Sequence, residues 1–574
     1  MFIRTKKSKN SPKCGVQIVE SKRVNGKVQQ KIIKHLGTAM EGEELEALKA
    51  LAQSVKQSIE QSGQLPLFDD EVRIDSKKDS TASKSSIDNK TNREDFNVNL
   101  LDIKEERRTI KGIHDIYGKL YNELGFSGII TNPARNKRSQ EALKEIVLAR
   151  VANPDSKRAS VSSLETNFAV HLDLNLVYRM MDKIGDKEIL KLNKLVYSKT
   201  KSLFKEKIDV IYFDATTLYF ESFSEDAFKK NGYSKDGKFN QPQVVLALMV
   251  TKEGLPVGYK AFSGDTFDGH TLIPVLKEIK EHYDLDRVVY VADAGMFNRD
   301  NLKEFETLDK EKMTYIVGAR IKNMPKSIQK EILNPNNYQT MDDNTKVATF
   351  DYEGKKLLVS HSLKRAKKDK HEREKGIEKL RDRLSKEKSL KAHLSNQGYK
   401  KYLQLQESES NQTDNKRNHS KQCDVSIVLN EKKIEEDAQW DGLKGIITNN
   451  SELTDKELLQ QYSNLWQVEE SFRITKHDLK VRPIYHYKEE RIKAHLAISF
   501  MAYTLVRHLE HRVRLQYKKL SPQRIRTALL GVQESILYDT KHNRKFALPS
   551  DITIDAEKIY KLMGVKVNKT PYKV

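Results

Sequence analysis

The chain opens with an alternation of apolar and polar residues that predicts a β-hairpin. Two β-prone runs, residues 14–21 and 27–33, flank the dipeptide Asn25-Gly26, and Asn-Gly between such runs is typical of a two-residue hairpin turn. A short helix is expected through residues 43–61. Residues 71–95 are rich in Ser, Asp, Lys and Asn and contain no aromatic residue, which predicts a flexible linker.

From residue 101 to residue 206 the apolar positions recur at helical spacing. Ser139 is the expected N-cap of the first clear helix, and Pro154 ends it. Further helices are expected over 158–167, 174–184 and 186–205. This basic helical domain either holds DNA or presents a solvated charged face, and no helix-turn-helix pattern decides between the two. Four apolar residues fall on one face of the first helix: Leu143, Ile146, Val147 and Val151.

Residues 207–320 change to the two-residue period of β-strands. Strands are expected at 208–214, 243–251 and 255–262, with turns at Asp236-Gly237 and Glu253-Gly254. A helix at 270–282 precedes a strand that ends at Asp293, and a helix at about 298–308 precedes a strand at 314–320. Adjacent strands followed by alternating helix and strand predict a mixed α/β sheet with an antiparallel edge.

An insertion interrupts the sheet pattern after residue 320. Irregular β-structure is expected over 321–362, and the highly charged residues 363–406 carry Ile377, Leu380 and Leu384 at helical spacing, which predicts one or two exposed helical arms. Residues 407–422 form a polar tip. Strands are expected again at 424–430 and 443–448, and helices at about 454–476 and 489–514. The last 60 residues show no clear pattern.

These changes of pattern divide the chain into seven segments. They are an N-terminal hairpin with a helix, a linker, a helical domain, the first part of the sheet core, the insertion, the second part of the core and a C-terminal region. Their bounds are 1–62, 63–100, 101–206, 207–320, 321–440, 441–515 and 516–574.

The charge of the chain narrows the function classes. Lys and Arg number 103 against 81 Asp and Glu, a net charge of +22, and such an excess attracts polyanions, most commonly nucleic acid. Cys14 and Cys423 are too few to staple the chain, which favours a reducing compartment. The first residues lack the apolar core of a signal peptide. The most apolar helical stretch, residues 494–506, is shorter than the ~20 residues that span a bilayer, so a cytoplasmic protein is expected.

Three acidic residues, far apart in the sequence, suit a metal-dependent nuclease. Asp214 and Asp293 each end an apolar run that predicts a strand, and Glu469 lies on the predicted helix 454–476. Their carboxylates converge at one edge of the sheet if the two strands are neighbours and the helix packs across them. Phosphodiester cleavage benefits from two Mg²⁺ ions about 4 Å apart, held by carboxylate oxygens. Glu470 is the adjacent competitor, but it points about 100° away from Glu469 on a helix.

The order Asp, Asp, Glu and the residues around each resemble the DDE transposases of bacterial insertion sequences. The glutamate helix resembles that of the superfamily with the signature Tyr-x2-Arg-x3-Glu-x6-Lys: Tyr462, Glu469 and Lys476 match, whereas Leu465 takes the place of the arginine. The opening hairpin and the segment from Arg150 to Arg158 are similar to one branch of long insertion-sequence transposases. Further family-like segments follow in order: Asp214-Ala215-Thr216-Thr217, Gly264-Asp265-Thr266, Thr271-Leu272-Ile273-Pro274, Ala292-Asp293-Ala294-Gly295-Met296, Asp441-Gly442 and Thr448-Asn449.

The resemblance implies a ribonuclease H-like α/β core with a β/helical insertion before the catalytic glutamate. It implies that Asp214, Asp293 and Glu469 are both catalytic residues and ligands of two Mg²⁺ ions, for which Mn²⁺ can substitute. The DNA-contacting residues that it implies are Tyr462, Arg473, Lys476 and Trp440. Arg473 would reach the phosphates that the missing signature arginine holds, and Trp440 would stack on an extruded base. Trp466 is expected to pack between the helix and the sheet.

The implied activity is cut-and-paste transposition. The protein would bind the terminal inverted repeats of its element, hydrolyse a strand at each end and join the 3′-hydroxyl to target DNA. The implied partners are double-stranded DNA and a second copy of the chain, because two element ends must be brought together; no membrane is involved. Two alternatives remain open: a ribonuclease H-like nuclease without strand transfer, and an inactive, transposase-derived DNA-binding regulator.

Overall fold

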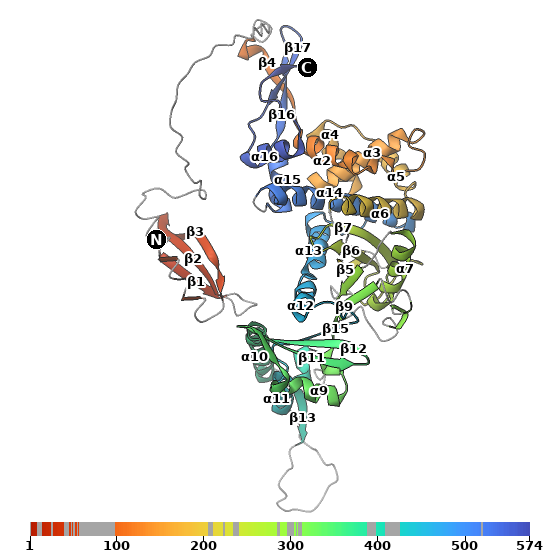
Figure 1. Cartoon of the computed structure of the whole chain (residues 1–574). Helices are drawn as coiled ribbons and strands as arrows, with labels where there is room; N and C mark the ends of the chain where they lie inside the picture. Colours follow the sequence, from red (N-terminus) through yellow and green to blue (C-terminus); the bar gives the residue numbers. More distant parts are fainter. Residues whose placement is uncertain are drawn as a thin grey trace, which may run out of the picture. The chain divides into compact units, whose positions relative to one another are not determined.

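The chain forms two compact units (Figure 1). Unit 1 comprises residues 1–89, 321–348 and 359–444, and unit 2 comprises residues 90–320, 349–358 and 445–574. The computed structural model describes residues 2–7, 14–24, 27–39, 45–46, 49, 52–53, 56, 98–204, 210–221, 224–233, 240–283, 288–294, 303–305, 307, 313–386, 398–407, 425–517 and 520–574.

The N-terminal part of unit 1 is a three-stranded antiparallel sheet with β2 at its centre. Its strands are β1 (Phe2–Lys7), β2 (Cys14–Val24) and β3 (Lys27–Ala39). Val24 pairs with Lys27, so the predicted hairpin is confirmed. The sheet buries Val16 and the unbonded Cys14 on one face.

Several predictions fall wholly or partly outside the described residues. The linker 71–95, the turn at Asp236-Gly237 and the tip 407–422, apart from residue 407, lie outside them. Of the predicted helix 43–61, residues 45, 46, 49, 52, 53 and 56 are described, and all are helical. Residues 303–305 and 307, in the predicted helix 298–308, are also helical.

The rest of unit 1 is built from the predicted insertion. Its helices are α9 (Lys326–Leu333), α10 (Leu363–Lys386) and α11 (Glu431–Ala438), and β13 (Leu403–Glu407) pairs antiparallel with β14 (Val425–Leu429). Helix α10 confirms the predicted arm. The prediction of irregular β-structure alone over 321–362 is wrong, because α9 lies there. This eight-residue helix buries only Ile332, which is too little periodicity to signal a helix.

The largest sheet of the molecule is mixed and has nine strands. In spatial order the strands are β10 (Gln339–Asp342), β11 (Thr345–Tyr352), β12 (Lys355–Ser362), β15 (Leu443–Thr448), β9 (Met313–Ala319), β8 (Val288–Ala292), β5 (Val210–Tyr219), β6 (Gln243–Thr251) and β7 (Pro256–Ser263). β8 and β9 run parallel to β5, whereas β6, β7 and β15 make antiparallel pairs with their neighbours. α7 (Leu272–His282) precedes β8, as predicted. This arrangement confirms the predicted mixed α/β sheet and fits a ribonuclease H-like core.

Strand β5 continues beyond the point predicted for its end. Asp214 lies in the middle of β5 and pairs with Leu248 of β6, so its assignment to the end of a strand is wrong. The following residues, Ala-Thr-Thr-Leu-Tyr, are β-prone and pair with β6 as far as Tyr219. The neighbouring β8 stops at Ala292. Asp214 therefore lies where β5 passes the end of its neighbour, and its side chain stays accessible at that edge.

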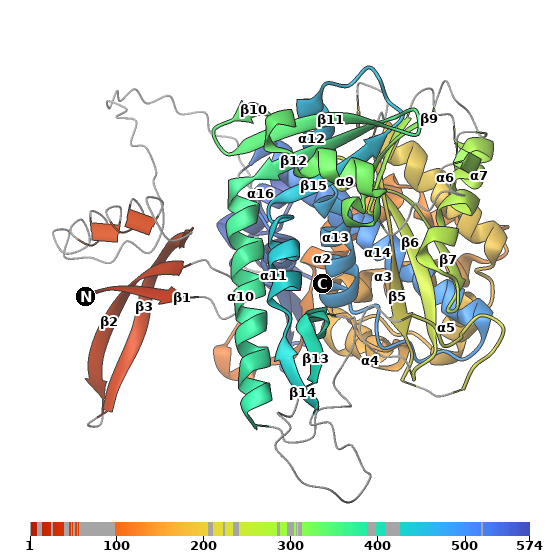
Figure 2. The same cartoon turned by 90° about the horizontal axis from the view of Figure 1, so that it is seen from below.

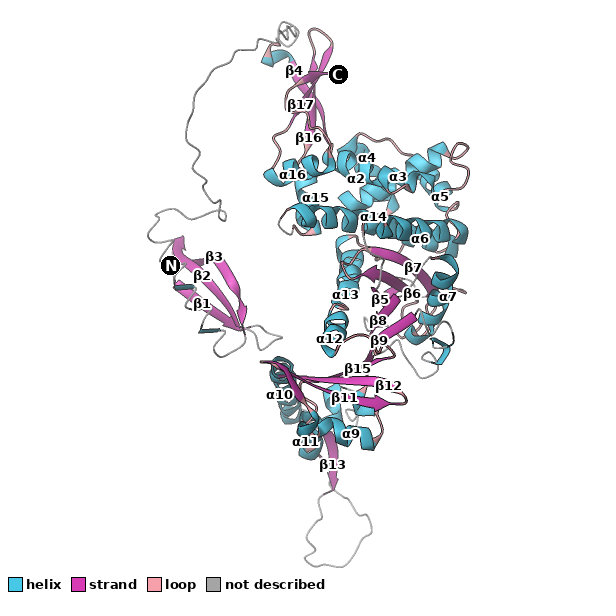
Figure 3. Cartoon of the chain, viewed as in Figure 1, coloured by secondary structure: helices cyan, strands magenta, loops and turns pink. Residues whose placement is uncertain are grey.

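Two helices of unit 2, α6 (Asp186–Lys201) and the largely buried α14 (Glu489–Gln516), pack against β7 of the sheet (Figure 3). Helix α3 (Lys137–Ala152) packs on α14. The four apolar residues predicted to share a face of α3 are all buried. Ser139 is not its N-cap, because the helix begins two residues earlier and Ser139 accepts a hydrogen bond from Lys183. The remaining helices are α2 (Gly112–Glu123), α4 (Lys157–Phe168) and α5 (Leu174–Met181).

A four-stranded sheet joins the start of the predicted helical region to the end of the chain. β4 (Ile103–Ile110) pairs with β16 (Gln533–Asp539), so the prediction that the region from residue 101 is helical throughout is wrong. The two partners are far apart in sequence, and β4 is mostly polar, so β4 carries no local strand pattern. The C-terminal residues also form α15 (Pro522–Leu530), β17 (Arg544–Pro549), α16 (Ile554–Met563) and β18 (Tyr572–Lys573).

The predicted helix 454–476 is broken. α12 (Asp455–Ser463) and α13 (Trp466–Arg473) are separate, and a π-helical turn (Ile474–Asp478) follows. At the break the N–H of Leu465 bonds to the carbonyl of Tyr462, three residues back, and the junction sequence Ser-Asn has low helix propensity. None of the helices in the described residues is long and apolar enough to cross a membrane.

Candidate active site

Asp214 lies in β5, and Asp293 directly follows the neighbouring parallel strand β8. β5 and β8 pair with Phe213 opposite Ala292, and the next residue on each chain is the aspartate. Neighbouring strands are about 4.8 Å apart, and residues paired in register on parallel strands point to the same face. Each Oδ1 accepts a hydrogen bond from the backbone N–H of the following residue, at 2.8 Å for Asp214 and 2.7 Å for Asp293. The two strands are therefore neighbours, which is the condition under which the two aspartates converge.

Helix α12 covers the face of the sheet that carries the two aspartates. Tyr212 is two residues before Asp214 and therefore on the same face of β5. The hydroxyl of Tyr212 donates a hydrogen bond to Oε1 of Gln461 in α12 at 2.9 Å. This contact fixes α12 beside the aspartate pair.

Tyr462, also on α12, reaches the second aspartate. Its side chain is buried, and its hydroxyl donates to Oδ1 of Asp293 at 3.4 Å. A Cβ on Gly318 of β9 would lie 2.3 Å from this hydroxyl, so the glycine leaves room for the tyrosine. Tyr462 therefore orients Asp293, and a contact between Tyr462 and DNA stays a prediction.

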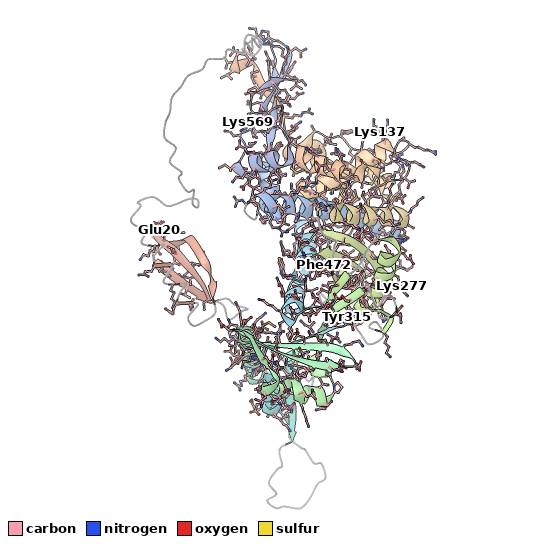
Figure 4. The ribbon with its side chains drawn as sticks, in the orientation of Figure 1. Glu20, Lys137, Lys277, Tyr315, Phe472 and Lys569 are labelled. Carbon is pink, nitrogen blue, oxygen red and sulfur yellow. The ribbon has the colours of Figure 1, made fainter. Side chains whose placement is uncertain are left out.

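Glu469 and Glu470 differ in their surroundings on α13. Glu469 is exposed. Phe472, three residues later on the same helix and labelled in Figure 4, is buried. Glu470 is held by Arg473, whose Nε and Nη2 donate to its two carboxylate oxygens at 2.8 and 2.7 Å. Arg473 also lies 3.4 Å from Asp478. The hydrogen bonds that Arg473 donates to Glu470 raise the pKa of the Arg473 guanidinium. Within the described residues no hydrogen bond or ion pair engages Glu469, so its carboxylate is available for other ligands.

A buried hydrogen-bond network that includes residues of α14 holds helix α13 in place. α13 packs on β5 and β6, and its buried Ser471 accepts a hydrogen bond from the hydroxyl of Tyr503 at 2.7 Å. Arg507 donates from Nε to the carbonyl of Gly254 at 2.8 Å. Gly254 has φ of 74°, and a Cβ there would lie 2.7 Å from Gln467, so only glycine fits this turn. The network fixes the height of Glu469 above the sheet.

A second buried cluster holds the segment that follows α13 and the π-turn. Arg150 of α3 donates from Nη1 to the carbonyls of Leu479 and Lys480 at 2.9 and 3.1 Å, and from Nη2 to that of Asp155 at 3.2 Å. Arg150 is only 2% exposed, and burial lowers the pKa of its guanidinium to about 10. It therefore remains charged at neutral pH.

Lys157 and His495 extend this cluster. The Nζ of Lys157 donates to Nδ1 of His495 at 3.2 Å, and Nε2 of His495 donates to the carbonyl of Val481 at 3.0 Å. Sequence reasoning assigned no role to Arg150 or Lys157, although Arg150 falls on the same face of α3 as the apolar residues. A charge in the middle of an apolar helix face is the signal that was available.

Residues 205–505, more than half of the 574-residue chain, match the family described as Transposase DDE domain. The chain belongs to the DDE transposase family. Residues 3–64 of this transposase match the IS1634 family transposase, N-terminal domain. Among curated proteins, none is similar enough to this transposase to serve as a comparison.

Membership in this family implies polynucleotidyl transferase activity, and DDE transposases generally use divalent metal ions. The residues of this transposase fit such ions chemically, because paired carboxylates are the oxygen donors that Mg²⁺ and Mn²⁺ prefer. Among the described residues, no group of three His, Cys, Asp or Glu side chains is close enough to hold one ion. The transposase therefore presents the Asp214 and Asp293 pair on the sheet and Glu469 separately on α13.

Lys476 and Trp440, which are also predicted to touch DNA, and Leu465, at the arginine position of the signature, are in three different settings. Lys476 lies half-buried on the π-helical turn after α13. Leu465, at the arginine position of the signature, is buried at the break between α12 and α13. Trp440 belongs to unit 1, where it is partly buried after α11. The prediction that Trp466 packs between helix and sheet is wrong: its side chain is 47% exposed, because the helix break turns the first residue of α13 to the surface.

Replacing Tyr462 by Phe in the transposase is expected to lower the rate of strand cleavage about three- to tenfold, because one hydrogen bond to the Asp293 carboxylate is lost. DNA affinity should not change. Single-turnover nicking of a DNA duplex that carries the element's terminal repeat measures the rate, with binding followed by fluorescence anisotropy. Tyr485→Phe is the matched control, since Tyr485 is 61% exposed. A loss of DNA binding without a loss of rate would contradict the orienting role.

Proposed function

We propose that this transposase binds the terminal inverted repeats of its insertion sequence, cuts a strand at each end and joins the freed 3′-hydroxyl to target DNA. The observation that carries the proposal is the register of β5 and β8, which places Asp214 beside Asp293 under α12 and α13. The DDE family membership supports the same reaction class. We also assign the chain to the superfamily with the Tyr-x2-Arg-x3-Glu-x6-Lys signature, with Leu465 as its departure.

Asp214, Asp293 and Glu469 would hold two Mg²⁺ ions. When bound, such ions stabilise negative charge on the attacking and leaving oxygens of an in-line displacement. In cleavage, a water oxygen bonds to phosphorus, the bond from phosphorus to the 3′-oxygen breaks, and the 3′-oxygen leaves as a hydroxyl. In joining, that 3′-oxygen bonds to a phosphorus of the target, and the target's own 3′-oxygen leaves. The three carboxylates act as ligands rather than as proton carriers.

Three further cationic or aromatic residues would contact the DNA. Lys476, on the turn after α13, is assigned to a backbone phosphate. Arg473 takes over the phosphate contact of the missing signature arginine only if DNA displaces Glu470, with which it is paired. Trp440 would stack on an extruded base. A homodimer would bring the two element ends together.

Excision in cells tests the whole proposal. A marked DNA segment bounded by the gene's own flanking repeats is supplied together with the wild-type protein, Glu469→Gln or Glu470→Gln. We expect excision with the wild type, at least a 10³-fold loss with Glu469→Gln because a metal ligand is removed, and at most about a tenfold loss with Glu470→Gln.

Each other outcome has a defined meaning. Equal excision by wild type and Glu469→Gln would overturn the assignment of the glutamate and make Glu470 the first replacement. Free cuts without joined products would favour the nuclease without strand transfer. Binding to the repeats with no excision by any variant would favour the regulatory DNA-binding protein.

A further inference from the structure

Helix α10 in unit 1 packs against its neighbours by one face only. Ile377 and Leu380 of this helix are buried together with Tyr402, and a Cβ on Gly376 would lie 2.3 Å from the ring of Tyr399. Arg373, on the same side, pairs with Asp441. Figure 2 shows α10 running alongside α11, β13 and β14. The other side of the helix faces away from these elements.

That outward face carries a row of basic residues. Successive residues of an α-helix are rotated by 100° about its axis. The packed residues of α10 therefore share one side of the helix, and the residues on the opposite side recur every three or four positions. Asp369, Glu372 and Glu374 fall outside this row, whereas Glu378 lies within it and Asp382 lies on the same face beyond its last lysine. We call the row the lysine stripe; its members are Lys364, Lys367, Lys368, His371, Lys375 and Lys379.

The cations of α10 divide into two groups by their partners. On the flanks, Arg365 lies 3.5 Å from Asp369, Lys370 lies 3.9 Å from Glu374, and Arg381 lies 3.8 Å from Glu431. Within the stripe, Lys368 lies 3.7 Å from Glu372. In the described part of the chain, the other four lysines of the stripe form no ion pair: Lys364, Lys367, Lys375 and Lys379. The stripe therefore retains positive charge that the flanks neutralise internally.

We propose that the lysine stripe binds the sugar-phosphate backbone of the target duplex without regard to its sequence. Lysine offers a mobile point charge that suits phosphate, whereas base reading relies on side chains that make paired hydrogen bonds. From Lys364 to Lys379 the stripe is about 22 Å long, which corresponds to roughly six base pairs of duplex axis. A sequence-blind surface suits DNA whose sequence is not prescribed. The inference rests on the proposed function, since that function supplies the target DNA.

Salt-dependent binding of the full-length protein tests the stripe. The probe is a 30-base-pair duplex of random sequence, and the variant is Lys364→Gln/Lys367→Gln/Lys375→Gln. Loss of three phosphate contacts should reduce the slope of log affinity against log salt by about 2–3 and lower affinity at least tenfold near 0.1 M salt. The matched control, Arg365→Gln/Lys370→Gln/Arg381→Gln, removes the same charge from the same helix and should change the slope by less than about 1.

The outcomes decide between surface contact and net charge. Equal losses in the two triple variants would overturn the proposal, because net charge alone would then explain the binding. An unchanged slope in the stripe variant would also overturn it. A loss confined to duplexes that carry the element's terminal repeat would overturn the assignment to target DNA.

A second measurement separates this inference from the proposed function. The stripe variant should cleave a pre-bound element end at a rate within about twofold of the wild type, while joining to a target plasmid falls at least tenfold, in proportion to the loss of non-specific affinity. Wild-type protein that binds random duplex through the stripe but never cleaves element ends would refute the proposed function and leave the stripe's affinity for duplex DNA in place. An equal loss of cleavage and joining would overturn the target assignment.

Discussion

Asp214→Asn is expected to lower strand cleavage and joining by at least 10³-fold, about 4 kcal/mol of transition-state stabilisation, while DNA affinity stays within about threefold. The substitution removes one negative charge and one ionised oxygen donor from the pair with Asp293. The asparagine Oδ1 can still accept the hydrogen bond from the N–H of Ala215, so the edge of β5 keeps its conformation. Asp293→Asn should behave in the same way, because Ala294 supplies the equivalent N–H.

Single-turnover cleavage and joining of a duplex that carries the element's terminal repeat, with Mg²⁺ or Mn²⁺, measure this effect. Fluorescence anisotropy on the same duplex measures affinity. Asp551→Asn, at an exposed position outside the sheet, is the control and should match the wild type. If Asp214→Asn cuts at the wild-type rate, the aspartate pair is not the catalytic centre. If it binds DNA poorly as well, the pair has a structural role instead.

Arg150→Met is expected to lower the free energy of unfolding by about 3 kcal/mol and the thermal midpoint by several degrees. The methionine fills much of the same space but donates no hydrogen bond, so the carbonyls of Leu479, Lys480 and Asp155 lose the donor seen in the structure. A buried carbonyl without a partner costs about 1–3 kcal/mol. The loosened segment follows the π-turn after α13, so cleavage should fall about tenfold even well below the midpoint.

Thermal unfolding followed by circular dichroism measures the stability, and single-turnover cleavage at 25 °C measures the activity. Arg158→Met is the matched control: Arg158 is the second residue of α4 and is exposed, so its loss should change the midpoint by less than about 1 °C. Arg150→Lys keeps the charge but not the fork of donors and should restore only part of the stability. A midpoint for Arg150→Met that equals the wild type would show that the segment after α13 is held by other contacts.

Local patterns were sufficient for most of the elements in the described part of the chain. The hairpin of β2 and β3, the strands β6, β7 and β15, and the helices α7 and α14 each have a sequence period or a turn dipeptide that belongs to a single element type. Asp214 and Asp293 stand out in the sequence because each is an acidic residue that follows an apolar run, and Glu469 because it lies on a predicted helix; their catalytic role stays a prediction. In these cases the cause of the structure lies within about fifteen neighbouring residues.

Other features depend on partners that are distant in the sequence. β4 is a polar stretch that becomes a strand only because β16, more than 400 residues later, supplies its hydrogen bonds. The helix around Glu469 breaks at Leu465 although its apolar period is continuous. Tyr462 had been assigned to DNA, and its burial against Asp293 follows from the room that Gly318 leaves in β9.

The sequence by itself determined the α/β class, the order of the three acidic residues and the excess of positive charge, since each is a property of composition or of short-range periodicity. Only the tertiary structure decided that β5 and β8 are neighbours in register, that Arg150 holds the segment after α13, and which side of α10 packs against its neighbours. These facts depend on hydrogen bonds and ion pairs between elements, and on which side of each helix is packed. Such contacts are set by the packing of the whole unit, which no local window of residues records.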